Sequence, residues 1–452
     1  MNYYVEEIPL INSFFQFCLA ILTAGSFFAQ QTADGHLYSS DPVPGNDALS
    51  GSYCAVVDSF DWGCAVSRVI LTLEKPVSKV AADQFLVVQE KQVIKNGADS
   101  SAAQSPLTIA REKRTVTNAY LCDSQGVPVQ GPSPYAALEF QVAPNVGSPL
   151  CYHPDTQHYR WAEPYRLVIE LLPETTLTAG HTRYSRLAID RTAARYIMPE
   201  IDQFTVSHYT GSTHTIPFAF YSPPSDNLRH PLVIWLHGLG EGGSDPRMPL
   251  LGASVSTFVQ SDFQSMMGGA HVLVPQCPTF WLDDGSGSAT RSGDSTYTWD
   301  LMALIRTYVS QHPDVDPDRI YIGGCSNGGY MTLALLLEAP DFFAAAFPTC
   351  QAYRDSWLSD KDIHTLKNIP LWFTHSQLDQ ICPPGESTFP TVTRLLAAGA
   401  KDVHLVKLGE ITGSSSYRFD PHYSWVPVLN GQCADPATGE SLFSWLCAQS
   451  RK

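Results

Sequence analysis

Ser326 lies in a glycine-rich segment whose residue types suit nucleophilic chemistry. The run Gly324-Cys325-Ser326-Asn327-Gly328 fits the pattern G-x-S-x-G, which forms a sharp turn from a strand into a helix and exposes the serine hydroxyl. Residues 319–322 before it are typical of a strand and residues 330–337 after it of a helix, as this turn requires. Glycines suit it because they lack the Cβ atoms that would clash. We interpret Ser326 as a nucleophile rather than part of an ordinary glycine-rich turn.

A serine hydroxyl needs a neighbouring base and a third group that orients the base. In hydrolases with this turn the acid follows the serine in the chain and the histidine comes last. Asp379 comes just after the buried-strand pattern of residues 369–375, and the carboxyl ends of parallel strands are where sheet enzymes place functional groups. Asp379 is therefore the predicted acid, with a turn aspartate as the alternative.

Two histidines, His404 and His422, follow Asp379 in the chain. His404 lies in the alternating run 402–407, so we expect it to point into packing or solvent as part of a strand. His422 lies in a loop that precedes a helical segment near residues 439–449, and a loop histidine can reach the edge of the sheet. The predicted base is His422.

The glycine-rich segment His237-Gly238-Leu239-Gly240-Glu241-Gly242-Gly243 follows a strand pattern and allows two interpretations. Its glycines satisfy G-x-G-x-x-G, a dinucleotide-binding pattern that needs a helix directly afterwards. Pro246 interrupts such a helix, so we favour an oxyanion loop, in which the backbone N–H groups of Leu239 and Asn327 bind the negative oxygen of the reacting carbonyl.

The elements around these residues divide the chain into three predicted parts: an N-terminal segment over residues 1–50, a β-sandwich over 51–200 and an α/β domain over 201–452. The sandwich is predicted from short alternating runs at 68–73, 84–88, 138–142 and 166–171, separated by turn residues such as Asp123-Ser-Gln-Gly126. Beyond residue 201, buried-strand runs at 231–236 and 271–275 alternate with helices such as 299–310. This alternation predicts a mostly parallel sheet covered on both faces.

The composition limits the classes of partner that the protein is expected to bind. The net charge of −16 and 44% hydrophobic residues describe an acidic globular protein, which disfavours binding to nucleic acid or to an anionic membrane surface. Eleven cysteines without a C-x-x-C pair argue against a zinc cluster and favour buried thiols, although Cys54 with Cys64, or Cys433 with Cys447, could pair in an oxidising compartment.

The first 30 residues leave the compartment open. Residues 14–28 are mostly apolar, as in a secretory leader, but Glu6 and Glu7 stand where a leader has basic residues. We therefore favour a packed N-terminal helix and a cytoplasmic protein, with secretion as the alternative.

Residues 205–450 resemble bacterial esterases related to polyhydroxybutyrate depolymerases and to feruloyl or acetyl-xylan esterases. The matching pieces are His237-Gly238, Val274-Pro-Gln-Cys-Pro278, the segment 324–329, Leu378-Asp379 and His422 to Trp425. The part before them, including 61–67 and 161–171, resembles the immunoglobulin-like domain of one bacterial branch. The chain departs from the pattern at Ser376 and Pro421, where glycine is common in the family.

This resemblance implies an α/β-hydrolase fold preceded by an immunoglobulin-like sandwich, and a serine carboxylesterase for short-chain acyl or aryl esters that needs no metal or organic cofactor. The expected partner is a small-molecule ester, with Trp281 beside the loop 283–295 as a candidate pocket residue or a structural tryptophan; homo-oligomerisation is left open. The alternatives are a serine peptidase of the prolyl-oligopeptidase type and a non-catalytic carbohydrate-binding or adhesive protein.

Overall fold

The computed structural model describes residues 48–94, 107–144, 146–414 and 416–451. These form two compact units. The first contains the described residues up to Thr205 together with Leu250–Ser256, and the second contains Val206–Pro249 and the chain from Thr257 onward. The predicted boundary between residues 200 and 201 stays a prediction, and the predicted helix or leader in residues 1–30 lies outside the described residues.

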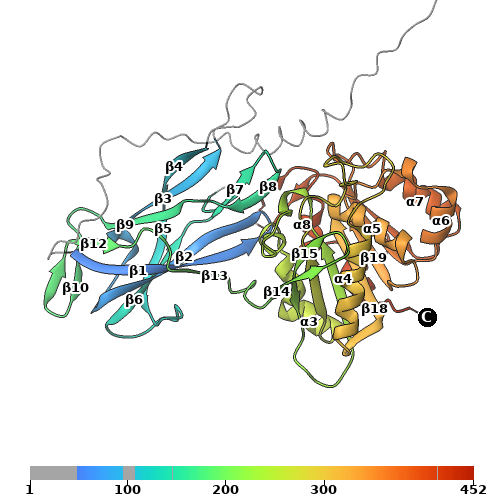
Figure 1. The fold of residues 1–452 in the computed structure, drawn as a ribbon. Helices are drawn as coiled ribbons and strands as arrows, with labels where there is room; N and C mark the ends of the chain where they lie inside the picture. The colour runs from blue at the N-terminus through green and yellow to red at the C-terminus, as the bar shows by residue number, and fades with distance from the viewer. Residues whose placement is uncertain (1–47, 95–106, 145, 415, 452) are drawn as a thin grey trace, which may run out of the picture. The chain divides into compact units, whose positions relative to one another are not determined.

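The first unit consists of β-strands (Figure 1). Its larger sheet has the order β12-β1-β2-β6-β5, with β13 also paired to β1, and a second sheet has the order β4-β3-β9. Two further pairs join β7 to β8 and β10 to β11. The strands are β1 (Ala48–Phe60), β2 (Gly63–Val77), β3 (Phe85–Ile94), β4 (Leu107–Arg114), β5 (Val116–Cys122), β6 (Ser133–Phe140), β7 (Leu150–His153), β8 (His158–Trp161), β9 (Tyr165–Leu171), β10 (Leu177–Ala179), β11 (Thr182–Tyr184), β12 (Arg186–Ile189) and β13 (Arg195–Ile197).

The alternating runs of the sequence become strands because one face of each is buried. In β9, Tyr165, Leu167 and Ile169 are buried while the residues between them are more exposed, as the side-chain period of two requires. The predicted turn after Cys122 also forms, since the Asp123 carboxylate accepts the backbone N–H groups of Gln125 and Val127 at 2.8 and 2.9 Å. The prediction of an all-β N-terminal domain is confirmed.

The second unit contains an eight-stranded sheet with the order β14-β15-β17-β16-β18-β19-β20-β21. β15 is antiparallel to β17, and the pairings from β17 through β21 are parallel. These strands are β14 (Thr205–Thr210), β15 (Thr215–Tyr221), β16 (His230–Leu236), β17 (His271–Pro275), β18 (Val315–Cys325), β19 (Ala345–Thr349), β20 (Leu371–Ser376) and β21 (Val403–Leu408); a small hairpin joins β22 (Ile411–Thr412) to β23 (Arg418–Phe419).

Helices alternate with these strands in the chain (Figure 1). They are α2 (Met248–Leu251), α3 (Ser261–Met267), α4 (Thr298–Gln311), α5 (Asn327–Glu338), α6 (Asp360–Leu366), α7 (Thr388–Ala397), α8 (Trp425–Leu429) and α9 (Leu442–Ala448). The sequence-predicted helix 299–310 corresponds to α4, and the predicted mostly parallel sheet with helices is confirmed.

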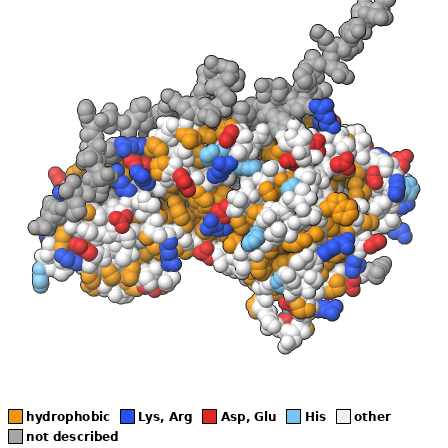
Figure 2. Space-filling view, viewed as in Figure 1, with side chains coloured by type: hydrophobic (Ala, Val, Ile, Leu, Met, Phe, Trp, Pro, Cys, Tyr) orange, Lys and Arg blue, Asp and Glu red, His pale blue; other side chains and the backbone are white. Residues whose placement is uncertain are grey.

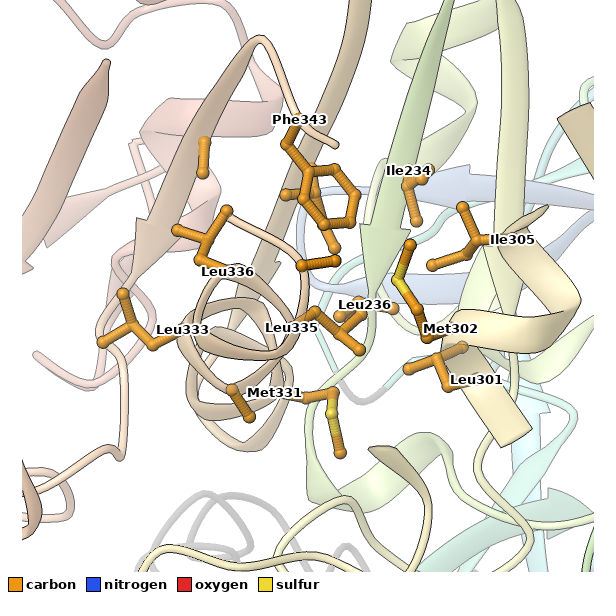
Figure 3. Packing of buried hydrophobic residues seen from close by; sticks show 14 of the residues in the cluster. Ile234, Leu236, Leu301, Met302, Ile305, Met331, Leu333, Leu335, Leu336 and Phe343 are labelled. Atoms are coloured by element: carbon orange, nitrogen blue, oxygen red, sulfur yellow. The ribbon is translucent and has the colours of Figure 1, made fainter. Parts of the chain in front are cut away.

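The core of the second unit holds α5 against the sheet. Figure 3 shows side chains of α4, such as Leu301 and Ile305, close to Ile234 and Leu236 of β16 and near those of α5, including Leu335. All five are fully buried, and burying each such side chain contributes about 1.5–3 kcal/mol. This packing fixes the junction between β18 and α5.

Three further features of the described residues bear on the predictions from composition: the surface charges, the helix lengths and the state of the cysteines. On the face of the second unit that Figure 2 shows, acidic and basic side chains are interspersed. Within the described ranges, no helix is long and apolar enough to cross a membrane. Every described cysteine is a free thiol, including Cys54, Cys64, Cys433 and Cys447, so neither of the two disulfide pairs considered from the sequence is present.

His271 begins β17 with no exposed surface. Its Nε2 lies 3.1 Å from Asp314 Oδ2, and the rings of His230 and His312 lie 6.4 and 5.6 Å away between centroids. Burial lowers the pKa of His271, the Asp314 carboxylate offsets part of this effect, and the two neighbouring histidines add to it. His271 is therefore neutral in the folded protein at neutral pH.

We expect this histidine to make stability depend on pH. Because its folded pKa is below the unfolded value of about 6.5, its contribution is complete above that value and decreases as the pH falls, by at most about 1.4 kcal/mol per pH unit. The Tm of the unmodified protein should fall between pH 7.5 and 5.5, and the fall should be smaller in His271→Gln. His208 is exposed, so His208→Gln should retain the full dependence; identical falls in all three proteins would refute the prediction.

Candidate active site

Ser326 occupies the turn between β18 and α5 with φ 55° and ψ −113°. A positive φ is uncommon for a residue with a side chain; it costs about 1–3 kcal/mol and persists only where the surrounding structure enforces it. Here the enforcement is visible, since the Ser326 N–H donates to the carbonyl of Thr349 at 3.0 Å and the Ser326 carbonyl accepts from Tyr330 and Ala352 at 2.9 and 3.2 Å. The strained turn holds the serine at the carboxyl end of β18.

Two glycines allow this turn to lie against β16. A Cβ on Gly328 would lie 2.0 Å from the Leu236 carbonyl oxygen, and one on Gly324 would lie 2.6 Å from the same atom. These distances are far shorter than real Cβ contacts, and the atom they meet is backbone. The G-x-S-x-G spacing is therefore required by close packing of the backbone as well as by the turn itself.

His422 lies in the loop between β23 and α8, and its Nε2 lies 2.9 Å from Ser326 Oγ. Its other ring nitrogen, Nδ1, lies 2.8 Å from Asp379 Oδ2. A carboxylate accepts hydrogen bonds only, so Nδ1 carries the hydrogen and Nε2 presents a lone pair to the serine hydroxyl. The structure thus brings together the three predicted residues in the geometry of a serine–histidine–aspartate triad.

Asp379 lies just beyond β20 and is buried. Its Oδ1 accepts the backbone N–H groups of Ile381 and Cys382 at 2.8 and 2.9 Å. Burial by itself raises the pKa of this carboxyl, but the opposing effects of His422 and His375, through charge and hydrogen bonds, outweigh it and hold the pKa well below its usual range. Asp379 is therefore ionised at neutral pH.

A hydrogen bond joins the loops that carry the acid and the base. The backbone N–H of Ser376, the last residue of β20, donates to Ser424 Oγ at 3.0 Å, and both residues are fully buried. Ser376 Oγ also donates to the Gly409 carbonyl at 2.7 Å. Ser376 stands where glycine is common in the esterases that the sequence resembles, and its hydroxyl thus has a partner that a glycine would not have.

Sequence reasoning treated His375 simply as the end of a strand, yet its Nε2 lies 3.1 Å from Asp379 Oδ2. The available signal was a histidine four residues before the predicted acid, at the end of a buried run.

His404, the histidine that the sequence analysis set aside as a base, stacks on Trp372 with ring centroids 4.5 Å apart. Its Nδ1 lies 2.7 Å from Asp435 Oδ2. His404 is a packed strand histidine, as the sequence predicted.

Leu239 and Asn327, the two predicted oxyanion donors, are each the first residue of a helical element, a single-turn 3-10 helix at Leu239–Glu241 and α5. N–H groups in the first turn of a helix lack a helical carbonyl partner, so both can receive an oxyanion. The glycine run leads into this single turn rather than the long helix that the dinucleotide interpretation requires. The donor assignments stay predictions.

His237 holds the start of that loop. Its Nε2 accepts the backbone N–H of Cys277 at 2.9 Å, so its Nδ1 carries the hydrogen, which is directed at the Gly238 carbonyl 2.6 Å away. Gly243 donates to the Cys277 carbonyl at 2.8 Å, and Gln276 Nε2 donates to the Glu241 carbonyl at 2.9 Å. The loop is therefore anchored to the segment after β17 at both of its ends.

Trp281 has no exposed surface, and its ring packs against His237 and Tyr297 with centroids 5.3 and 6.1 Å apart. Its predicted role in a substrate pocket stays a prediction.

Glu241 lies on the glycine-rich loop that follows His237. One of its carboxylate oxygens lies 3.9 Å from His237 Nδ1, and burial raises the pKa of Glu241 to about 7.

Three cysteine thiols lie near Ser326, and two of them are shown by their pKa shifts to be protonated. Cys325 precedes it in the chain, Cys350 follows β19, and Cys382 Sγ lies 4.0 Å from Ser326 Oγ. Burial raises the pKa of Cys325 and of Cys350 well above the usual range, so both are neutral thiols at neutral pH, and the thiolate is the nucleophilic form. The Ser326 hydroxyl, in contrast, lies within hydrogen-bonding distance of the His422 imidazole.

Comparison with known proteins gives two family matches. Residues 52–182 match the esterase immunoglobulin-like N-terminal domain, and residues 289–362, which include Ser326, match the prolyl oligopeptidase family. No curated protein matches the chain.

Among solved structures, a thermostable esterase is 22% identical and covers 89% of this chain and 100% of its own, with a TM-score of 0.68. A ferulic acid esterase is a more distant match, 12% identical, covering 50% of this chain and 94% of its own with a TM-score of 0.37. The predicted fold, an α/β-hydrolase domain preceded by an immunoglobulin-like sandwich, is confirmed, and the two family matches bear out the predicted enzyme class, a serine hydrolase.

Proposed function

We propose that the protein is a serine carboxylesterase that hydrolyses short-chain acyl or aryl esters of small molecules. The observation that carries the proposal is the continuous chain of contacts from Ser326 Oγ to His422 Nε2 at 2.9 Å and from His422 Nδ1 to Asp379 Oδ2 at 2.8 Å. Its ester specificity is supported by the match of residues 52–182 to a domain found in esterases.

The proposed reaction has two halves. His422 takes the proton of Ser326 as the oxygen attacks the ester carbonyl, and the backbone N–H groups of Leu239 and Asn327 stabilise the oxyanion. The imidazolium then gives its proton to the departing alcohol, which leaves an acyl-enzyme. In the second half His422 takes a proton from water as the water oxygen attacks the acyl carbonyl, and the imidazolium then gives that proton to Ser326 Oγ as the carboxylic acid is released.

A peptidase of the prolyl-oligopeptidase type is the second candidate, because residues 289–362 match that family. The two functions differ in the bond that is cut, and the same triad serves both. Hydrolysis of p-nitrophenyl acetate and butyrate should therefore be compared with hydrolysis of a proline p-nitroanilide. We expect cleavage of the esters; activity on the amide alone would reject the esterase proposal.

Ser326→Ala should remove this activity while leaving the Tm within a few degrees, since the change deletes one oxygen from a position already held by its backbone. We expect kcat on p-nitrophenyl acetate to fall by about 10⁴-fold or more. A fluorophosphonate probe should label the unmodified protein at Ser326 and leave the variant unlabelled. Ester hydrolysis that survives the substitution would assign the chemistry to another residue and reject Ser326 as the nucleophile. Absence of ester hydrolysis and of labelling in the unmodified protein would instead favour the non-catalytic binding interpretation.

A further inference from the structure

Asp379 is shared by two imidazole rings. His422 Nδ1 approaches its Oδ2 at 2.8 Å, and His375 Nε2 approaches the same oxygen at 3.1 Å. His375 and Asp379 are both buried, with no exposed side-chain surface. The proposed reaction uses His422 as the base and gives His375 no role.

The contacts of His375 fix its hydrogen. Its Nε2 faces two acceptors, Asp379 Oδ2 at 3.1 Å and the Cys382 carbonyl at 2.9 Å, so Nε2 must carry the hydrogen. Its Nδ1 lies 2.8 Å from Thr388 Oγ1, and a hydroxyl can donate to a ring lone pair. A neutral ring with the hydrogen on Nε2 satisfies every contact.

The carboxylate of Asp379 is thereby held from both sides. Oδ1 accepts the N–H groups of Ile381 and Cys382, and Oδ2 accepts the two imidazole N–H groups. His375 contacts both the carboxylate and the Cys382 carbonyl, so it joins the acid to the turn that follows it. Without this ring, Oδ2 would have one donor, and the carboxylate plane would lose a restraint on the side that faces His422.

We propose that His375 is a positioning residue of the active site, which holds the Asp379 carboxylate toward His422 and limits its basicity by donating a second hydrogen bond to Oδ2. This inference rests on the proposed function, because it takes His422 as the base. His375 transfers no proton in the reaction. Its effect reaches Ser326 through Asp379 and His422.

The second donor has a consequence for pH. A carboxylate oxygen that serves two donors is a weaker acceptor for each, so loss of the His375 contact makes Asp379 a stronger partner for protonated His422. The protonated, inactive base then persists to higher pH. The acidic limb of the kcat/KM profile should move to higher pH when the donor is removed.

Other ionisable groups face this cluster. The thiols of Cys350 and Cys382 adjoin Asp379 and Ser326, Glu241 lies beside Cys325, and Lys407 Nζ lies 4.7 Å from the ring centroid of Phe389, which borders His375. These groups are the same in every His375 variant, so differences between the variants report His375 itself.

Two substitutions separate positioning from packing. In His375→Gln the side-chain amide reaches about as far as Nε2 and can keep a donor on Oδ2, whereas the shorter amide of His375→Asn reaches as far as Nδ1 and loses it. Both place a buried amide at one position, so the two variants should have similar Tm values. His404→Asn is a matched control, since His404 also lies between two carboxylates, Asp402 and Asp435.

The experiment measures kcat and KM on p-nitrophenyl acetate from pH 5 to 9 and, in parallel, the rate of fluorophosphonate labelling of Ser326. We expect His375→Asn to lower kcat by about tenfold to a hundredfold with little change in KM, and to shift the acidic limb upward by both readouts. His375→Gln should recover most of kcat and the original limb. His404→Asn should leave the limb unchanged.

The inference is overturned if the limb stays in place in His375→Asn, or if the Gln and Asn variants lose kcat equally, because a purely structural ring predicts both results. Labelling separates this outcome from failure of the proposed function. If the unmodified protein labels at Ser326 but cleaves no ester, the esterase proposal fails and the labelling profile still decides the role of His375. If Ser326 does not label at all, both are rejected.

Discussion

Asp379→Asn is expected to lower kcat by about 10⁴-fold in protein that still folds. The backbone N–H groups of Ile381 and Cys382 face Oδ1, so the amide oxygen takes that position and the NH₂ group faces His422. To avoid two opposed donors, His422 must present its lone pair at Nδ1 and carry its hydrogen on Nε2. The ring then donates toward Ser326 Oγ and cannot take its proton.

The matched control is Asp435→Asn. Asp435 accepts from His404 Nδ1 at 2.7 Å, the same kind of pair, but His404 has no contact with Ser326 among the described hydrogen bonds. Steady-state kinetics on p-nitrophenyl acetate and the rate of fluorophosphonate labelling should both fall for Asp379→Asn and stay near normal for Asp435→Asn. A kcat within tenfold of the unmodified protein in Asp379→Asn would remove Asp379 from the triad.

Gly328→Ala is expected to destabilise the fold by about 3 kcal/mol or more and to abolish activity in any protein that still folds. The new Cβ would lie 2.0 Å from the Leu236 carbonyl oxygen and 2.6 Å from that of His237. Both atoms are backbone, at the junction of β16 with the glycine-rich loop 237–243. Relief of the overlap requires moving either this loop or the turn that carries Ser326.

Gly385→Ala provides the comparison, since a Cβ there meets no atom within 4 Å and its φ lies outside the left-handed region. We expect it to change the free energy of unfolding by less than about 1 kcal/mol. Urea unfolding and soluble yield measure both variants. A Gly328→Ala protein with normal stability and activity would show that the turn and β16 can separate without loss.

The sequence predicted the residues that obey local rules. Ser326 was identifiable because a five-residue pattern, a preceding strand and a following helix all lie within one short segment. β16, β17 and α4 were identifiable because their apolar residues follow a strand or helix period. Asp379 and His422 followed from chain order, a rule about position relative to other elements.

What remained unpredicted depends on pairings between distant segments. β1 pairs with its neighbour in the chain, β2, but also with β12 from the far end of the same unit, and no local pattern encodes the register with β12. The contact of His375 with Asp379 depends on how the turn after β20 folds back onto the strand. Likewise, the hydrogen bond from Ser376 to Ser424 requires two loops to meet that are separate in the sequence.

The hydrogen bond from Ser376 to Ser424 links the loop that carries Asp379 to the loop that carries His422. Ser376 and Ser424 fix the end of β20 to the start of α8, and His422 and Asp379 lie on the two sides of the joint. A displacement of either loop carries the other with it, so their mutual geometry persists while the distance to Ser326 changes. In the proposed triad, such a displacement would lengthen the 2.9 Å contact between His422 Nε2 and Ser326 Oγ, and we expect it to lower the reactivity of Ser326 while His422 stays paired with Asp379.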